Sequence, residues 1–361
     1  MLPSAQIRRK ETVQKLKAAV IGCGGRGMEH ARGYRAVPDT ELVGVAEAMN
    51  ERREKAVKEL GCAGYATVAE MLDKAKPDIV SIVTQPMQRC ELTLQCAAAN
   101  SVKAITAEKP MAMNIAEADQ MLAACVKANI ILTVSQQMRF CPEFVSVQEA
   151  IARGDIGKVE FLRGVSYGNL MNQGTHVLDM IRWFAGEPRI EWVQSSWAEP
   201  EGYRDVGSPA PMWMICYIAF EGGIRACMEN GLLYQKAGGV FYHDWLQKRV
   251  AAIGSEGFAE ARVAGYGKVL SAGKSGWQMT PADNKTWDAA TPAYIRELVE
   301  CIRTGKLHRN HGRESTQTFE GMMALAQASV DGGIVKLPIS RMRDPLAELN
   351  AKRPAPMALA R

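Results

Sequence analysis

Short apolar runs alternate with helical patterns in the first part of the chain. Each apolar run is short enough for one buried strand, and the segments between the runs have the spacing of a helix. The apolar runs lie at 18–21, 42–46, 79–83, 102–106 and 130–134. The helical segments lie at 28–35, 50–60, 68–75, 90–100 and 115–128. Strands that alternate with helices form βαβ units, so the pattern predicts a parallel α/β domain over residues 17–140.

The alternation changes after residue 141, where strand-like runs follow one another with turns between them. A helix is predicted over 144–153, and Glu221-Gly222-Gly223 is typical of a hairpin turn. The strand-like runs lie at 159–167, 190–197, 213–220, 224–230 and 250–254. Because successive strands joined by turns pair antiparallel, residues 141–340 are predicted to form a second domain of the α+β type.

Three further segments show neither the helical nor the strand spacing of apolar residues. Residues 259–289 are rich in Gly and Lys, and we expect an irregular loop that crosses to a neighbouring subunit or closes the site. The tails, 1–16 and 341–361, are predicted to be arms outside both domains.

A glycine-rich turn follows the first predicted strand directly. Gly22, Gly24 and Gly27 form a G-x-G-x-x-G motif, which permits a tight turn, a close approach of the backbone to a pyrophosphate and close packing of helix on strand. The free N–H groups at the start of the next helix favour the phosphate charge. The second strand ends in Glu47, where an acidic group binds a ribose diol. The sequence therefore predicts a dinucleotide site.

The choice between NAD and NADP depends on Glu47 and two arginines. Arg52 and Arg53, in the first turns of the helix over 50–60, are suited to an adenosine 2′-phosphate, but Glu47 repels that charge. NAD is favoured over NADP for this reason, and two solvated arginines on a helix face are the alternative interpretation of Arg52 and Arg53.

Other polar residues follow predicted parallel strands in the same way. Thr84 closes the strand over 79–83, and Lys109 comes shortly after the next strand. Ligands of parallel sheets bind beyond the carboxyl ends of the strands. Gly22, Glu47, Thr84 and Lys109 all fall at such ends, so we expect them to lie around one site.

Several motifs together resemble the Gfo/Idh/MocA family, whose members are NAD(P)-dependent oxidoreductases of sugars, inositols and their derivatives. The resemblance rests on the glycine-rich turn, Thr84-Gln85-Pro86, Glu108-Lys109-Pro110 and the G-T-H-V-L-D run at 174–179. It extends to segments at 136–140, 154–159, 254–257, 294–307 and 314–330. The family fold implies an N-terminal Rossmann dinucleotide-binding domain and a C-terminal α+β domain with an open, mostly antiparallel sheet. One face of that sheet would carry the substrate and the other would pack against partner subunits, in a homodimer or homotetramer.

The resemblance and the strand-end argument together assign the cofactor site. The residues expected to bind NAD are Gly22, Gly24, Gly25, Arg26, Gly27, Glu47, Arg52, Thr84, Gln85, Pro86, Glu108 and Lys109.

Two residues are expected to be catalytic. Oxidation of a secondary alcohol needs a hydride acceptor and a base, and His176 is the strongest candidate for the base. Thr175 is a plausible N-cap, so the helix dipole would keep His176 neutral, and Asp179 would share its face and orient the ring. Lys109, which the resemblance assigns to the catalytic site, would stabilise the developing alkoxide. Whether the Lys109-Pro110 bond is cis is left open by the sequence.

Two positions depart from the family pattern. Asn172 stands where the family usually has an aspartate, four residues before the histidine, and an amide cannot act as a base. Either His176 and Lys109 suffice, or the enzyme treats its substrate differently. Arg89 stands where the family often carries a histidine.

Hydrogen-bonding groups near the expected cleft suit a polyhydroxylated ring. Arg139 is the exception, because its planar fork also suits a substrate carboxylate or sulfonate. Ordinary surface or core polarity is the alternative for each. The candidates for substrate contact are Arg139, Tyr167, Asn169, Asn172, Gln173, His176 and His243.

The composition limits the kinds of partner that the sequence predicts. The net charge of +5 and the lack of a basic block argue against nucleic acid, and no apolar run reaches the length of a membrane span. The nine cysteines are scattered without a C-x-x-C pair, which favours buried thiols in a reducing compartment over a disulfide frame or a metal site. Arg8-Arg9 is followed by polar residues, so an export signal is disfavoured and a cytoplasmic protein is expected.

The sequence leaves three functions open. The leading one is an NAD-dependent oxidoreductase that transfers a hydride between a ring alcohol of a sugar or cyclitol and nicotinamide. The second is a redox-neutral elimination, epimerisation or glycoside cleavage through a transient keto sugar. The third, a non-catalytic sensor of NAD and sugar, is disfavoured because both Lys109 and His176 are present.

Overall fold

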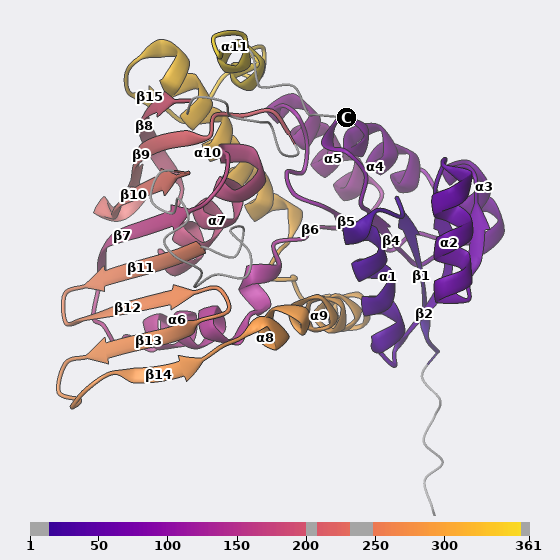
Figure 1. Ribbon diagram of the computed structural model, residues 1–361, viewed down its shortest axis with the longest axis horizontal. Helices are drawn as coiled ribbons and strands as arrows, with labels where there is room; N and C mark the ends of the chain where they lie inside the picture. Colours follow the sequence, from indigo (N-terminus) through magenta and orange to yellow (C-terminus); the bar gives the residue numbers. More distant parts are fainter. Residues whose placement is uncertain (1–13, 200–207, 232–247, 355–361) are drawn as a thin grey trace, which may run out of the picture.

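Two sheets organise the part of the chain that the computed structural model describes, residues 14–199, 208–231 and 248–354 (Figure 1). The first sheet is six-stranded and wholly parallel, in the order β3-β2-β1-β4-β5-β6. Its strands are β1 (Leu16–Ile21), β2 (Thr40–Ala46), β3 (Ala63–Tyr65), β4 (Ile79–Ile82), β5 (Ala104–Ala107) and β6 (Ile131–Val134). The order reverses direction between β1 and β4, which is where a doubly wound sheet binds its ligand.

Helices cover both faces of this sheet, so its central strands are apolar along their length rather than alternating. Every residue of β4 and β5 is buried. The helices of this part are α1 (Gly25–Ala36), α2 (Asn50–Leu60), α3 (Val68–Ala75), α4 (Arg89–Ala97) and α5 (Ile115–Lys127). The predicted Rossmann domain is confirmed, and only the short edge strand β3 is an addition.

The second sheet has nine strands in the order β14-β13-β12-β11-β7-β10-β9-β8-β15. Its neighbours pair antiparallel except for β7 and β10, which are parallel. The strands are β7 (Val159–Ser166), β8 (Ile190–Ala198), β9 (Trp213–Phe220), β10 (Arg225–Asn230), β11 (Lys248–Gly254), β12 (Gly257–Arg262), β13 (Tyr266–Ser271), β14 (Gln278–Pro281) and β15 (Val335–Lys336). The predicted open, mostly antiparallel sheet is confirmed.

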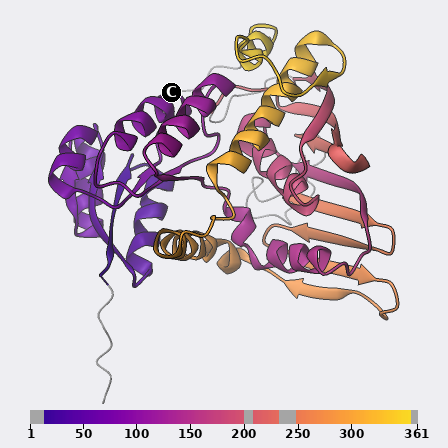
Figure 2. The ribbon, with the colours of Figure 1, turned by 180° about the vertical axis from the view of Figure 1, so that it is seen from behind.

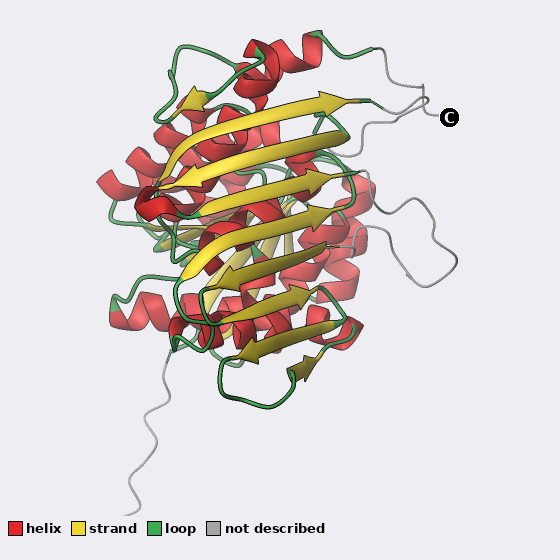
Figure 3. Cartoon of the chain, turned by 90° about the vertical axis from the view of Figure 1, so that its left-hand side faces the viewer, coloured by secondary structure: helices red, strands yellow, loops and turns green. Residues whose placement is uncertain are grey.

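One face of this sheet carries helices and the other is bare (Figure 3). Helices α6 (Pro142–Ala152), α7 (Thr175–Phe184) and α10 (Gly312–Asp331) lie on the covered face. The approach of α7 to β7 requires glycine, because a Cβ on Gly164 would lie 2.3 Å from a methyl carbon of Val177. The bare face exposes large apolar side chains on β9, β11 and β13: Ile215, Tyr217, Ile253 and Leu270.

The expectation of an irregular loop over 259–289 is wrong. Strands β12, β13 and β14 and the short helix α8 (Asn284–Asp288) occupy most of this segment. These strands lie toward the edge of the sheet and bury few large side chains, so small inward residues such as Ala259 and Ala261 hid the alternation. Their pairing is tertiary and leaves little local signal.

The prediction of a C-terminal arm over 341–361 is also partly wrong, because Pro345–Ala351 forms helix α11. The Asp344 carboxylate caps this helix by accepting a hydrogen bond from the N–H of Ala347. Leu346 and Leu349 are buried, and α11 packs on α10. Residues 355–361 lie outside the described part.

Helix α9 (Ala290–Thr304) comes from the second half of the chain but packs on the first sheet beside α1 (Figure 2). The Tyr294 hydroxyl donates a hydrogen bond to Thr133 of β6, and a Cβ on Gly33 of α1 would lie 2.8 Å from Ile295. The two domains are therefore interlocked rather than joined by one linker. In the described residues, no helix is long and apolar enough to cross a membrane.

Candidate active site

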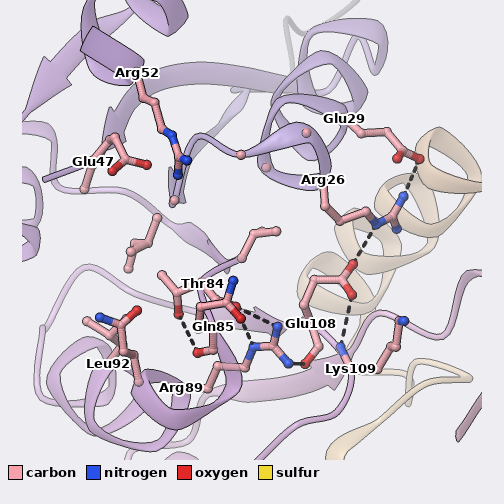
Figure 4. Close-up of a pocket in the computed structure, with 18 of the residues that line it drawn as sticks. Arg26, Glu29, Glu47, Arg52, Thr84, Gln85, Arg89, Leu92, Glu108 and Lys109 are labelled. Carbon is pink, nitrogen blue, oxygen red and sulfur yellow. Dashed lines mark hydrogen bonds and ion pairs between the residues drawn. The ribbon is translucent and has the colours of Figure 1, made fainter. Parts of the chain in front are cut away.

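A cleft of about 720 Å³ lies at the carboxyl ends of the parallel strands, with walls from both domains. Figure 4 shows the part of it that the first domain lines. The first domain contributes the glycine-rich turn, Glu47, Arg52, Thr84, Gln85, Arg89, Glu108 and Lys109. The second domain contributes Gln173, His176, Lys248 and Trp287. The strand-end prediction is met in that Gly22, Glu47, Thr84 and Lys109 line one cleft.

The glycine-rich turn has the geometry of a phosphate cradle. Gly22 has a φ of +93°, and a Cβ on Gly27 would lie 1.8 Å from the carbonyl oxygen of Gly22. Nothing lies within 4 Å of a Cβ built on Gly24 or Gly25, so the backbone there faces open space. Helix α1 begins at Gly25 without a side-chain cap. Its free N–H groups therefore point to a place where a pyrophosphate fits.

Glu47 is held in a fixed orientation at the end of β2. Its two carboxylate oxygens accept hydrogen bonds from the backbone N–H groups of Cys23, at 2.9 Å, and Met49, at 3.0 Å. Each oxygen keeps a further lone pair for a hydroxyl group. Arg52, exposed on α2, lines the cleft on the same side (Figure 4). These residues fit the ribose of a dinucleotide.

A buried carboxylate anchors the loop that follows β5. Glu108 is 3% exposed, and its Oε1 lies 2.9 Å from Nε of Arg26 and 3.1 Å from Nε2 of His30. Burial alone would raise the pKa of Glu108, but Arg26 and His30 hold it well below its ordinary value. The other carboxylate oxygen accepts the backbone N–H of Lys109 at 3.1 Å. The ion pairs thus fix the backbone from which Lys109 projects.

Lys109 reaches across the cleft to the second domain. Its Nζ donates hydrogen bonds to the carbonyl oxygen of Asn172 at 2.8 Å and to the side-chain Oδ1 of Asn172 at 3.1 Å. The Lys109-Pro110 bond is cis. Burial lowers the pKa of Lys109 to about 8; Glu108 opposes this shift, while Arg26 and Arg89 add to it. The amine therefore changes its charge near physiological pH.

Arg89 ties two loops of the cleft together. Its Nη1 donates to the carbonyl oxygens of Glu108, at 2.9 Å, and Pro110, and its Nε and Nη2 donate to the carbonyl oxygen of Thr84 at 3.2 and 2.7 Å. The side chain is 5% exposed. The residue that departs from the family pattern thus holds the loop of Lys109 against the end of β4.

His176 lies in the same cleft, 3% exposed. Burial is the main cause that lowers its pKa well below the ordinary value, and the positive charges of Lys109 and Lys248 add to it. Its Nδ1 has no hydrogen-bond partner among the described residues. A neutral imidazole, the form that a base requires, therefore lines the cleft.

His176 lies in the first turn of α7 as expected, but two other expectations about its surroundings are wrong. Thr175 is not an N-cap, because the π-helical turn Leu170–Gly174 runs directly into α7, and its hydroxyl accepts a hydrogen bond from Gln136. Asp179 does not orient the ring, because it forms a two-bond ion pair with Arg139.

Arg139 is not a lining residue of the cleft. Its guanidinium is 1% exposed and donates to Asp179 at 2.9 and 2.8 Å, to Glu187 at 2.7 Å and to the carbonyl oxygen of Arg309 at 2.8 Å. Every edge of the fork is engaged, so no edge is left for a substrate carboxylate. The expectation of substrate contact at Arg139 is corrected accordingly.

Other expected site residues divide between the cleft and its support. Gln173 lines the cleft, and Asn172 contacts Lys109. Asn169 is buried and accepts the N–H of Asn172, so it supports the turn rather than lining the cleft. Pro86 is buried, Tyr167 is half-buried, and neither is among the lining residues. His243 lies outside the described residues.

Lys248 and Trp287 line the cleft, and sequence reasoning missed both. A signal for Lys248 was present, because it shares the inward face of β11 with Val250 and Ala252, two and four positions on. Trp287 lay in the segment that was expected to be irregular. Within the described residues, no group of three or more His, Cys, Asp or Glu side chains is placed to hold a metal ion.

Comparison with known families defines the class of protein. Residues 16–136 match a model described as an oxidoreductase family with an NAD-binding Rossmann fold, and residues 157–337 match its C-terminal alpha/beta domain. Fold and cleft thus define a two-domain, NAD-binding oxidoreductase. The chain belongs to the Gfo/Idh/MocA family.

Individual relatives are dehydrogenases of inositols and sugars. The chain is 28% identical over 187 residues to myo-inositol 2-dehydrogenase of Thermotoga maritima, a match that covers 48% of this chain and 55% of that enzyme. It is 25% identical over 350 residues to scyllo-inositol 2-dehydrogenase (NAD(+)) of Bacillus subtilis, covering 91% and 98%. The chain thus spans about half the length of the Thermotoga enzyme and nearly all of the Bacillus enzyme. A levoglucosan dehydrogenase in complex with NADH and levoglucosan shares the fold, with a TM-score of 0.80, 18% identity and coverage of 90% and 100%.

Proposed function

We propose that this protein oxidises a ring secondary alcohol of a sugar, sugar derivative or cyclitol with NAD. The observation that carries the proposal is that Lys109 and His176, which come from different domains, line the same cleft as the glycine-rich turn. The inositol and levoglucosan dehydrogenases among the related proteins support the substrate class.

The residues of the first domain would hold the dinucleotide. The N–H groups at the start of α1 would bind its pyrophosphate, and Glu47 would bind the ribose hydroxyls. When bound, nicotinamide supplies the acceptor for the hydride. Glu47 would also repel a 2′-phosphate, which favours NAD, whereas Arg52 on the same side would attract one.

Lys109 and His176 have different roles toward the hydroxyl group of the alcohol. The neutral imidazole of His176 removes the hydroxyl proton. The ammonium of Lys109 donates a hydrogen bond to the same oxygen and stabilises the negative charge that develops on it. Glu108 and Arg89 keep the Lys109 loop in place during the reaction.

The test is a measurement of NADH absorbance with a panel of inositols and sugars. Lys109→Met and His176→Gln are expected to lower kcat by about 10²–10⁴, the usual contribution of a positioned acid or base. NADH affinity, measured by fluorescence titration, should stay the same in His176→Gln. Lys127→Met, at the exposed end of α5, is the matched control. Full activity in both site variants would refute the assignment.

A redox-neutral reaction is the second candidate, and Asn172 leaves it open because an amide cannot act as a base. Lys109 contacts an amide at this position, so the aspartate that the family usually has here is missing from the site. Substrate turnover at catalytic NAD, without net growth of NADH absorbance, would establish this candidate and exclude the first.

We also propose a homodimer or homotetramer that buries the bare face of the second sheet. Ile215 is 56% exposed and Tyr217 is 45% exposed on that face, which is unusual for apolar side chains on neighbouring positions of a monomer. Tyr217→Lys should shift the mass found by sedimentation velocity to a smaller species. An unchanged mass would mean that the face is not the interface. All nine cysteines are free thiols, which supports the proposal of a reducing, cytoplasmic setting.

A further inference from the structure

A buried arginine lines the cleft next to the loop that carries Lys109. The Arg89 side chain is 5% exposed, and it lines the cleft together with Lys109 and Thr84 (Figure 4). Burial lowers the pKa of Arg89 to about 10, so its guanidinium keeps a positive charge at pH 7. A charge inside a protein acts over a longer distance than a charge in water, because its surroundings screen it less.

Carbonyl oxygens hold this guanidinium in place. Its Nε and Nη2 donate to the carbonyl oxygen of Thr84 at 3.2 and 2.7 Å, and its Nη1 donates to the carbonyl oxygen of Glu108 at 2.9 Å. These acceptors are neutral, so the hydrogen bonds orient Arg89 without cancelling its charge. The nearby carboxylate of Glu108 attracts Arg89, but it is already paired with Arg26 and His30.

The charge of Arg89 acts at the place where the proposed reaction occurs. Its Nη1 donates to the carbonyl oxygens of the residues on either side of Lys109, which are Glu108 and Pro110. The same charge is one of the causes that lower the pKa of the Lys109 amine. In the proposed function, Lys109 binds the oxygen of the carbon that gives up its hydride. Arg89 therefore faces the end of the cleft where the nicotinamide ring would receive that hydride.

The two redox states of the cofactor differ in charge at that end. The nicotinamide ring carries a positive charge in NAD⁺ and none in NADH, whereas the pyrophosphate is the same in both. A cation near the ring therefore repels NAD⁺ and has little effect on NADH. Loss of that cation would favour NAD⁺ whatever other charges surround it, so the sign of the effect is fixed.

We propose that Arg89 selects the redox state of the cofactor, so that the cleft binds NADH more tightly than NAD⁺. The inference rests on the proposed dehydrogenase function and adds a residue that tunes its cofactor. Because binding and reaction are linked in one thermodynamic cycle, tighter binding of NADH raises the equilibrium constant for oxidation in the bound state by the same factor. Arg89 thus favours transfer of the hydride from the alcohol carbon to NAD⁺, while His176 takes the hydroxyl proton.

The test compares the affinities of the full-length protein for the two redox states at pH 7. NADH affinity is measured by fluorescence titration, and NAD⁺ affinity by displacement of bound NADH. Since the pKa of Lys109 is about 8 and loss of Arg89 would raise it, Lys109 is mostly an ammonium in every sample. We expect the dissociation constant of NAD⁺ to be about tenfold higher than that of NADH in the unaltered protein. Equal constants would overturn the proposal.

Variants of Arg89 separate its charge from its support of the loop. Arg89→Gln removes the charge but keeps an amide that can donate to a carbonyl oxygen. It should lower the ratio of the NAD⁺ and NADH dissociation constants about tenfold. Arg89→Lys keeps the charge and should keep the ratio, although both affinities can weaken. An equal loss of both affinities in Arg89→Gln would mean that Arg89 only supports the loop, and the proposal would fail.

Arg52→Gln is the matched control. Arg52 lines the same cleft beside Glu47, at the ribose end, where NAD⁺ and NADH carry the same charge. Its loss should change both affinities by the same factor and leave their ratio unchanged. A ratio that falls as far in Arg52→Gln as in Arg89→Gln would overturn the proposal, because it would report only the net charge of the cleft. If Arg89→Gln does not fold, Arg89→His is the second neutral variant, with the residue that the family often carries there.

The outcomes also distinguish this inference from the proposed function. Oxidation of a sugar or inositol by a protein whose affinity ratio does not depend on Arg89 would overturn this inference and leave the dehydrogenase intact. Absence of NADH binding in the same titration would overturn the dehydrogenase itself, and this inference with it.

Discussion

Replacement of Arg139 by methionine tests whether this residue holds the fold or binds a ligand. Methionine keeps an unbranched apolar side chain but removes two bonds to Asp179, one to Glu187 and one to the carbonyl oxygen of Arg309. The side chain of Asp179 is 2% exposed, so its carboxylate would be left buried without a counter-charge. The side chain of Glu187 is 29% exposed and would be rehydrated at little cost.

The unpaired Asp179 carboxylate therefore dominates the expected loss. Breaking a buried ion pair by removal of one partner costs about 3–5 kcal/mol, whereas an exposed pair contributes about 0–1 kcal/mol. We expect Arg139→Met to lower the free energy of unfolding by about 3–5 kcal/mol. Arg153→Met, which breaks a pair with Asp155 from a side chain that is 58% exposed, is the control and should cost about 0–1 kcal/mol.

Urea unfolding, followed by tryptophan fluorescence, measures both variants. A double variant, Arg139→Met with Asp179→Leu, removes the unpaired charge and should recover most of the loss, which gives a large coupling energy between the two sites. The reasoning fails if Arg139→Met unfolds at the urea concentration of the unaltered protein but raises KM for the sugar. That result would make Arg139 a substrate ligand after all.

Four further predictions concern the cleft. The ammonium form of Lys109 stabilises the alkoxide and the pKa of Lys109 is about 8, so kcat/KM for oxidation should fall above about pH 8. Because His176 is neutral at lower pH, kcat/KM should be constant below pH 8. A value of kcat/KM that keeps rising with pH would contradict this. Asn172→Asp should raise the pKa of Lys109 and move that fall to higher pH, and an unmoved profile would show that residue 172 does not set the charge. Gly27→Ala places a Cβ 1.8 Å from a backbone oxygen of the turn, so it should cost about 1–3 kcal/mol in unfolding free energy and weaken NADH binding; unchanged values of both would exclude the close packing. Glu47→Ser should raise the ratio of kcat/KM with NADP to that with NAD, and a constant ratio would remove Glu47 from cofactor selection.

The parts of the fold that the sequence predicted are those with strong local patterns. Strand β1 and the turn at Gly22 are local features, and Glu47 and Lys109 followed from the rule for strand ends. The strands of residues 257–281 were missed because small inward residues and edge positions give little periodicity, although their register is regular in the sheet. Lys248 was missed because a lysine at the start of a strand is normally solvated.

Partners of buried charges could not be predicted, because they are chosen by the tertiary fold. The spacing of His176 and Asp179 on one helix suggested a contact, yet Arg139, from another segment, takes both oxygens of Asp179. Likewise, Glu108 is next to Lys109 in sequence but its side chain pairs with Arg26 and His30 of α1. A spacing along one helix gives the contacts that are available, and the packing of other elements decides which of them form.

Burial lowers the pKa of Lys109, and the groups that accept its hydrogen bonds carry no negative charge to oppose this shift. Its ammonium is held by two oxygens of Asn172, both neutral, so the hydrogen bonds orient the amine without adding a countercharge. The nearby carboxylate of Glu108 is already paired with Arg26 and His30, which limits how far it can raise the pKa of Lys109. Burial therefore outweighs attraction and brings the pKa to about 8. A carboxylate at position 172 would reverse that balance, so the amide at this position is what lets the lysine exchange its proton near neutral pH.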